Sequence, residues 1–254
     1  MHSMSAEVLD GSRLSETELS ALWAFRTTLF QLKPTVDPAV DRHHFVEVVR
    51  ASRVARFTDG EGTLVGFWTQ RVLRAQVGRR SAWVYSPDFG YLAAPYRGHP
   101  VFMRVLLRLM WPAILSALVR PTFLLGTGYP PSYMLACRRG LAMVADGHAP
   151  AGSLVGVVLA ALREEMTGTI APCPVATMNT IPEVPGSGWF ARYGESTELR
   201  AYEAINPNWR AGYALYCGAQ IKPGIVIGGL KAGILRALRN RPRISGRRPE
   251  PSRR

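Results

Sequence analysis

The sequence predicts an α/β fold in which a mixed, mostly antiparallel central sheet is flanked by helices. Two amphipathic helical segments open the chain, three strand-like segments follow as a meander, and a strongly apolar helix leads into a further strand. With 254 residues, of which 47% are hydrophobic, the chain is long enough for one large domain. This composition argues against intrinsic disorder of the whole chain.

The first helix is predicted to begin after Ser15, which can cap it. Glu18 lies three residues further on, which is the spacing of a capping box. Apolar residues then recur at helical spacing until Pro34 ends the run: Leu19, Leu22, Trp23 and Phe30. A second helix is predicted after Asp37-Pro38, with an apolar stripe of Phe45, Val48 and Val49.

Strand-like segments follow these helices in the pattern of an antiparallel meander. The predicted strands are 53–57, 64–72 and 81–85, the last extended by 89–92 beyond a bulge at Pro87. The tight connection at 59–62, Asp-Gly-Glu-Gly, is typical of a turn between antiparallel strands. A helix from 100 to 119, a strand at 122–126 and a helix at 131–138 complete the predicted core.

The segment from Val101 to Val119 is almost wholly apolar, so a membrane span is one interpretation of it. Arg104 and Arg108 would each cost about 2.5 to 3.5 kcal/mol near a bilayer centre. We therefore predict a buried helix of a soluble domain. Residues 1–13 lack the basic start and apolar run of a secretory signal, and the three cysteines are too widely spaced for a disulfide framework. These features predict a cytoplasmic protein.

Composition shifts suggest three parts of the chain. We predict a core over 1–145, an extension packed on it over 146–221, and a basic amphipathic helix with a disordered Arg-rich tail over 222–254. The formal net charge is +13, and the last part alone holds ten basic residues and one acid. This tail is either solvated or attracted to an anionic membrane surface. No aromatic residues interleave its arginines, so no specific nucleic-acid partner is predicted.

Two local motifs and the element order resemble those of one enzyme family. Thr63-Leu64-Val65-Gly66-Phe67 is similar to the "grlvGf" strand of the GNAT superfamily of acyl-CoA-dependent N-acyltransferases, and Ala94-Pro95-Tyr96-Arg97-Gly98 is similar to its "peyRG" segment. The resemblance covers roughly residues 14–140, and 206–212 resembles an "NPgyarG" closing motif of uncharacterised bacterial GNAT-like chains. The resemblance implies a GNAT-like fold, in which a central strand splays from its neighbour. The pyrophosphate of acyl-CoA then lies at the start of the helix that follows this strand.

The family motif Gln/Arg-x-x-Gly-x-Gly/Ala brings bare backbone N–H groups of a helix start onto phosphate oxygens. Aligned on Arg97, its two glycine positions hold Pro100, which has no N–H, and Phe102, which is bulky. The resemblance implies that the donor acyl-CoA or acetyl-CoA contacts Leu92, Arg97, Gly98, His99 and Arg104. The alternative is that the two arginines are solvated or paired with Asp88.

The resemblance also implies that an amine attacks the thioester directly in a ternary complex. A tyrosine in the helix after the 122–126 strand then protonates the leaving thiolate, and Tyr133 occupies that place. Its alternative role is that of a core or interface tyrosine. Asp88, His99 and Glu183 are the candidate bases, because a carboxylate or imidazole must reach the amine directly or through one water. No metal site is predicted, because the adjacent His43-His44 side chains diverge on a helix.

The sequence thus predicts transfer of an acyl group from acyl-CoA, or from an acyl carrier protein thioester, to an amine of a small molecule or peptide. The alternative is a catalytically inactive GNAT-like scaffold that binds a ligand or partner, including at a membrane surface. Motifs of zinc metalloproteases, α/β-hydrolases and P-loop NTPases are absent from the sequence. The sequence does not indicate an oligomeric state.

Overall fold

The computed structural model describes residues 3–29, 31–138, 140–167, 175–177, 180–181, 194–222 and 224. The strands are β1 (Met4–Asp10), β2 (Gln31–Leu32), β3 (Arg53–Asp59), β4 (Leu64–Val77), β5 (Arg80–Leu92), β6 (Thr122–Gly128), β7 (Val144–Ala145), β8 (Val175–Thr177), β9 (Thr180–Ile181) and β10 (Tyr213–Gln220). The helices are α1 (Glu16–Leu29), α2 (Pro38–Arg50), α3 (Pro100–Ser116), α4 (Pro130–Arg138), α5 (Leu154–Thr167) and α7 (Thr197–Ile205), with short 3-10 turns at Gly11–Arg13, Ala94–Tyr96 and Trp209–Ala211.

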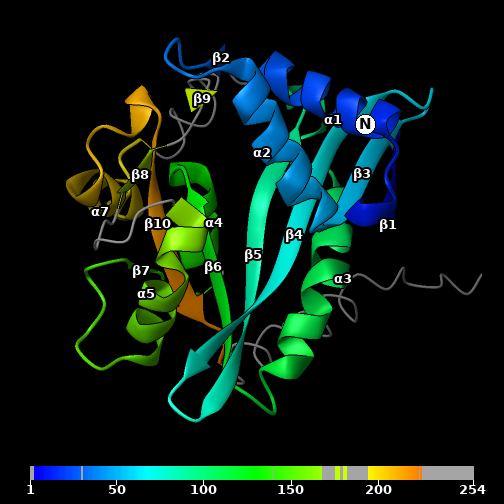
Figure 1. The fold of residues 1–254 in the computed structure, drawn as a ribbon. Coiled ribbons are helices and arrows are strands. Elements are labelled where there is room, and N and C mark those ends of the chain that lie inside the picture. Colours follow the sequence, from blue (N-terminus) through cyan, green and yellow to red (C-terminus); the bar gives the residue numbers. More distant parts are fainter. Residues whose placement is uncertain are drawn as a thin grey trace, which may run out of the picture.

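One eight-stranded sheet organises the described residues (Figure 1). Its strand order is β1-β3-β4-β5-β6-β10-β7, with β8 paired to β10, while β2 and β9 form a separate small sheet. All the pairings are antiparallel except that of β5 with β6, which is parallel. The predicted mixed, mostly antiparallel sheet flanked by helices is confirmed.

The two opening helices begin where their caps predict. The backbone N–H of Ser15 donates to Glu18 Oε2 at 2.9 Å, and the Glu18 N–H donates back to Ser15 Oγ at 3.3 Å, so the capping box forms. Asp37 caps α2 by accepting from the Ala39 N–H at 2.8 Å, and Pro38 takes the first helical position. Local sequence therefore determines where both helices start.

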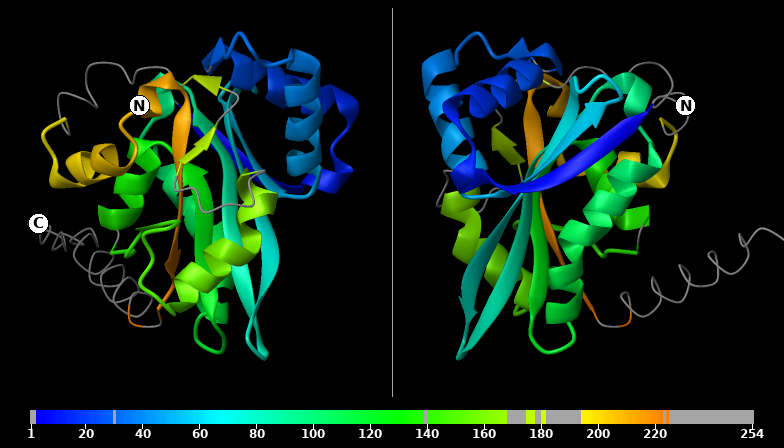
Figure 2. Two further views of the ribbon diagram at one scale, coloured as in Figure 1. Left: turned by 60° about the vertical axis from the view of Figure 1, so that its left-hand side comes forward. Right: turned by 90° about the vertical axis from the view of Figure 1, so that its right-hand side faces the viewer.

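Helices cover both faces of the sheet (Figure 2). On one face α1 and α2 pack on β3 and β4 through a core of Leu19, Leu22, Phe45, Val49, Val54 and Phe67. On the other face α3 packs on the same strands through a core of Ala55, Phe57, Val65 and Leu109. Along β3, Val54 faces the first core while Ala55 and Phe57 face the second, which follows the period of two in a β-strand.

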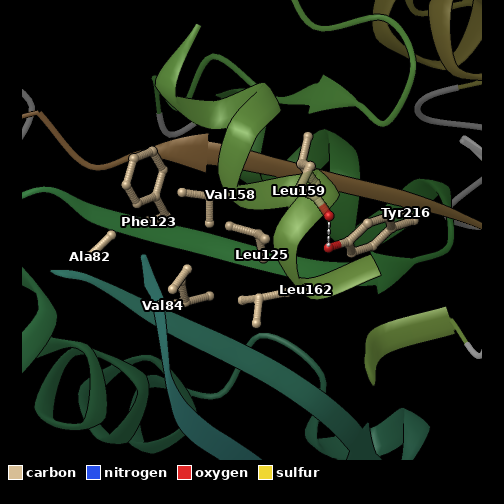
Figure 3. Close-up of a cluster of buried hydrophobic side chains, with 9 residues drawn as sticks. Ala82, Val84, Phe123, Leu125, Val158, Leu159, Leu162 and Tyr216 are labelled. Carbon is tan, nitrogen blue, oxygen red and sulfur yellow. Dashed lines mark hydrogen bonds between the residues drawn. The ribbon is translucent and has the colours of Figure 1, made fainter. Parts of the chain in front are cut away.

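Helix α5 closes the α1–α2 face beside β5 and β6 (Figure 3). Its side of the cluster is Val158, Leu159 and Leu162, and the sheet contributes Ala82, Val84, Phe123, Leu125 and Tyr216. The Tyr216 hydroxyl donates to the Leu159 carbonyl at 3.0 Å, so the one polar group in the cluster is satisfied.

Two long strands lie outside the predicted elements, as do the short strands β2, β7, β8 and β9. β1 precedes the first helix and pairs with β3, and β10 lies inside the sheet between β6 and β7. β10 is buried from Ala214 to Ala219 and reads as a continuous apolar run without alternation, so its sequence pattern carries no strand period. The predicted boundary at residue 145 therefore runs through the sheet. The predicted tail lies outside the described residues, apart from Lys222 and Gly224.

Candidate functional site

The parallel strands β5 and β6 pair over only a short stretch. Their register joins Trp83–Tyr85 to Thr122–Leu124, and no pairing continues beyond it. Beyond this stretch β5 continues to pair with β4, with a register shift between Trp68 and Gln70 of β4. β6 continues to pair with β10. Two neighbouring parallel strands thus part towards their carboxyl ends, which is where open α/β sheets bind ligands.

Gly66 of the family-like strand motif lies opposite Leu92 at the end of β5. A Cβ atom at Gly66 would lie 2.7 Å from the Tyr91 carbonyl oxygen and 2.6 Å from a methyl carbon of Leu92. Only glycine therefore allows β4 to approach the end of β5 so closely. This glycine fixes the place where the chain leaves the sheet for α3.

The connection from β5 to α3 holds most of the predicted phosphate neighbours. The Arg97 side chain folds back, and its Nε donates to the Leu92 carbonyl at 3.2 Å. Gly98 has φ +83°, in the left-handed region that favours glycine. His99 follows as the N-cap of α3. The structure thus places Leu92, Arg97, Gly98 and His99 on one strand-to-helix connection.

The backbone donors at the start of α3 are largely committed within the chain. The Val101 N–H donates to His99 Nδ1 at 3.3 Å, the Phe102 N–H donates to the His99 carbonyl at 3.1 Å, and Pro100 has no N–H. A neutral His99 that accepts at Nδ1 carries its proton on Nε2. In this connection the N–H of Gly98 has no hydrogen-bond partner among the described residues.

The bulk of Phe102 does not obstruct this helix start. Its ring packs on Phe57 at 5.3 Å and on Trp68 at 6.0 Å between ring centroids, so the side chain points into the core beneath α3. Arg104 is exposed about one helical turn after Pro100 and forms no ion pair with a described residue. The remaining deficits of the motif are the missing N–H of Pro100 and the Val101 and Phe102 N–H groups that are already bonded to His99.

Asp88 lies in the irregular part of β5 and is held by an arginine other than those expected. Arg71 binds it through two bonds, Nη2 to Oδ1 at 2.7 Å and Nε to Oδ2 at 3.0 Å. The Ser86 hydroxyl donates to Oδ1 at 3.0 Å, and the Asp88 side chain is 7% exposed. Asp88 therefore pairs with Arg71, and the alternative pairing with Arg97 or Arg104 is wrong.

Tyr133 lies on α4, the helix that follows β6. Its ring contacts Tyr202 edge-on at 5.4 Å between centroids. Burial, followed by the thiols of Cys137 and Cys217, raises the pKa of Tyr133 to about 12. The phenol therefore keeps its proton at neutral pH, as a proton donor to a thiolate must. Glu183 lies outside the described residues.

Tyr202 is a residue that the sequence analysis missed. Its hydroxyl donates to the Gly128 carbonyl at 2.8 Å and accepts from Asn206 Nδ2 at 3.1 Å and from the Leu215 N–H at 3.2 Å. This single phenol therefore joins α7, the end of β6 and β10, directly before α4 begins. The closing motif at 206–212 was a signal for this place, because Asn206 belongs to it.

The described residues contain neither a cluster of metal-ligating side chains nor a membrane-spanning helix. No group of three or more His, Cys, Asp or Glu side chains able to hold a metal ion occurs among them. His43 lies 3.4 Å from Glu47, and both it and His44 are exposed. None of the helices in the described part of the chain has the length and apolarity needed to cross a bilayer.

A sheet whose central parallel pair splays, and whose first splayed strand enters a helix through an Arg-Gly connection, is GNAT-like. No protein-family model matches the sequence, and no curated protein matches it. Solved structures do match. A protein of unknown function from Enterococcus faecalis V583, described as a probable N-acyltransferase, has 13% identity and a TM-score of 0.39. That match covers 60% of this chain and only 38% of the Enterococcus chain.

Two further structures are similar over most of their own length. Arabidopsis thaliana NAA60 in complex with a bisubstrate analogue has 12% identity and a TM-score of 0.40, covering 59% of this chain and 93% of that one. An acyl-CoA N-acyltransferase from Pseudomonas aeruginosa has 17% identity and a TM-score of 0.38, covering 57% and 92%. At these TM-scores the similarity assigns no substrate, partner or residue role to this chain.

Proposed function

We propose that this chain transfers an acyl group from acyl-CoA or acetyl-CoA to an amine of a small molecule or peptide, by direct attack in a ternary complex in the cytoplasm. One observation carries the proposal. β5 parts from its parallel neighbour β6 and enters α3 through Arg97, Gly98 and His99. In the proposal, the thioester lies where the two parallel strands part, and charged or N–H donors beside it bind the phosphates.

In this proposal the donor phosphates lie at the β5–α3 connection. Arg97 supplies positive charge, and the Gly98 N–H and the Nε2–H of His99 supply donors that no other described residue uses. Arg104 adds charge one turn further along, while Leu92 ends the strand that borders the thioester. These contacts replace part of the N–H cradle that Pro100 removes.

In the chemical step, the amine attacks the thioester carbonyl and the carbon–sulfur bond breaks. The leaving thiolate takes a proton from Tyr133, and the amine gives its proton to a base. Asp88 and Glu183 are the proposed bases, because His99 already accepts the Val101 N–H at Nδ1 and carries its proton on Nε2. Because both oxygens of Asp88 already accept hydrogen bonds from Arg71, an Asp88 base would have to share its carboxylate with that arginine.

The occupied donors at the start of α3 favour a second donor class within the same reaction. An acyl carrier protein presents its thioester on a phosphopantetheine arm, which has no pyrophosphate. The loss of helix-start N–H groups at Pro100, Val101 and Phe102 therefore costs less for this donor than for acyl-CoA. Comparing turnover with acyl-CoA and with acyl carrier protein thioesters decides between them.

Titration calorimetry with acetyl-CoA and longer acyl-CoAs tests the proposal against an inactive scaffold. We expect binding with a negative heat-capacity change, because apolar surface is buried around the acyl chain. Arg97→Ala should weaken this binding, and Arg200→Ala, on an exposed part of α7, is the matched control. An absence of both binding and turnover with every thioester would favour the scaffold.

Tyr133→Phe tests the proton donor. The variant should lower kcat by roughly 100-fold or more, the range for loss of general acid catalysis, and leave thioester binding unchanged. Tyr129→Phe removes a neighbouring phenol from the same cluster and is the control. Equal activity of Tyr133→Phe and the native chain would show that Tyr133 is a core tyrosine only.

A further inference from the structure

The solvent side of α3 has an unusual composition for a surface helix. Five of its neighbouring positions are exposed, and at 100° per residue they fall within an arc of about 100°. These positions are Arg104, Leu107, Arg108, Trp111 and Leu115, and the exposed Leu118 and Val119 extend them beyond the helix. We call this surface the α3 outer face.

Exposed apolar side chains gather on this face rather than being scattered over the molecule. Of the nine large apolar side chains that are exposed among the described residues, five belong to the α3 outer face, with exposures between 43% and 76%. The other four are spread over α2, β4 and α5. In Figures 1 and 2, α3 runs along the sheet with its outer side turned away from the other described helices. A clustered apolar surface of this kind marks an interaction site.

The charge of this region has one sign. Between Asp88 and Asp146 the sequence contains six arginines and no acidic residue. Arg104 and Arg108 are exposed on the α3 outer face and form no ion pair within the described residues. Arg120 follows at the end of the face and lies over the Trp83 ring at 5.3 Å. The occupant of this face should therefore be both anionic and apolar.

We propose that the α3 outer face docks on an anionic membrane surface. Arginines flank the leucines, with Trp111 midway, and indole rings favour the level of lipid headgroups. A second copy of this chain is a poor occupant, because a symmetric contact would bring the arginines of both copies together. The chain's own C-terminal segment from residue 222 is also strongly basic and would be repelled in the same way.

The end of the described chain lies beside this helix. Ile221 is buried with Ala113 of α3 and with Ala117, the residue that caps this helix, and its N–H donates to the Thr122 carbonyl at 2.9 Å. The ten basic residues that begin at Lys222 therefore start beside α3, next to the side of the helix that is buried against the sheet. They add attraction for the same anionic surface, because each basic residue near such a surface contributes to binding.

Co-sedimentation of the full chain with vesicles tests the proposal. Native protein should bind vesicles that contain phosphatidylglycerol, bind phosphatidylcholine vesicles weakly, and be released by salt. The double variant Leu107→Gln with Leu115→Gln should lower the partition coefficient roughly tenfold or more. Val40→Gln with Val157→Gln removes comparable exposed apolar side chains from α2 and α5 and should bind as the native chain does.

A second measurement reports insertion of the face itself. Lipids with brominated acyl chains quench a tryptophan that enters the bilayer, so they should quench the native protein but not Trp111→Phe. Unchanged partitioning of the Leu107→Gln, Leu115→Gln variant, equal binding to neutral vesicles, or quenching that persists in Trp111→Phe would each overturn the proposal. So would a native dimer that the double variant converts to a monomer.

Discussion

The two faces of the sheet differ in whether their arginines are paired with carboxylates. On the α1–α2–α5 face, the buried Arg26 and the half-buried Arg71 and Arg163 are matched with the carboxylates of Asp41, Asp88 and Asp146 respectively. Exposed charges there are paired as well, as in Arg50 with Glu16. On the opposite face, α3 presents arginines without carboxylates, set among exposed leucines.

We infer from this difference that the paired charges of the first face serve stability, whereas the unpaired arginines of the α3 outer face are available for the contact proposed above. A buried charge without a partner costs several kcal/mol, so the first face must be complete for the chain to fold. Leaving the arginines of the α3 outer face unpaired costs little free energy, because water solvates them. Its composition is therefore free to serve contacts with another surface. Three measurements test this contrast between the two faces.

The largest effect is expected at the buried pair of Arg26 and Asp41, whose closest atoms lie 2.6 Å apart. Asp41→Ala leaves the Arg26 guanidinium buried without its carboxylate and should lower the free energy of unfolding by about 3 to 5 kcal/mol in urea titrations. Glu16→Ala, which breaks the exposed pair with Arg50, should cost no more than about 1 kcal/mol. Equal costs for the two variants would contradict the contrast between buried and exposed charge.

An effect of intermediate size is expected at alkaline pH, where buried tyrosines make the free energy of unfolding fall as pH rises. Burial raises the pKa of Tyr216, so the folded chain holds this proton more tightly than the unfolded chain does. Above the unfolded pKa near 10, the unfolded state binds fewer protons, and the free energy of unfolding falls as pH rises. One such group contributes up to about 1.4 kcal/mol per pH unit. Tyr216→Phe should give a shallower decline, and an unchanged slope would assign the decline to other groups.

The smallest effect is expected on α3. Leu115→Gln, at a side chain 48% exposed, should change the free energy of unfolding by no more than about 0.5 kcal/mol. Leu109→Gln, on the buried side of the same helix, should cost several kcal/mol, because it removes apolar burial and leaves an amide without a partner. A large loss in Leu115→Gln would mean that the outer face is part of the fold.

Part of the candidate site was readable from the sequence. The connection from β5 through Arg97 and Gly98 into α3 was predicted, because the strand pattern and the long apolar run of the helix are local signals and the Arg-Gly pair carried the resemblance to GNAT chains. The partner of Asp88 was not, since Arg71 lies 17 residues away and reaches it only across the β4–β5 pairing. The direction of the Phe102 ring was equally hidden, because only the helix packing turns it towards Phe57.

By itself the sequence determined the helix starts, the meander and the charge imbalance, since caps, turns and periodicity act over a few residues. The tertiary structure decided that β10 enters the sheet between β6 and β7 and that β5 and β6 part after three paired residues. It also decided which side of α3 meets solvent. These outcomes depend on contacts between segments far apart in the chain, which no local pattern records.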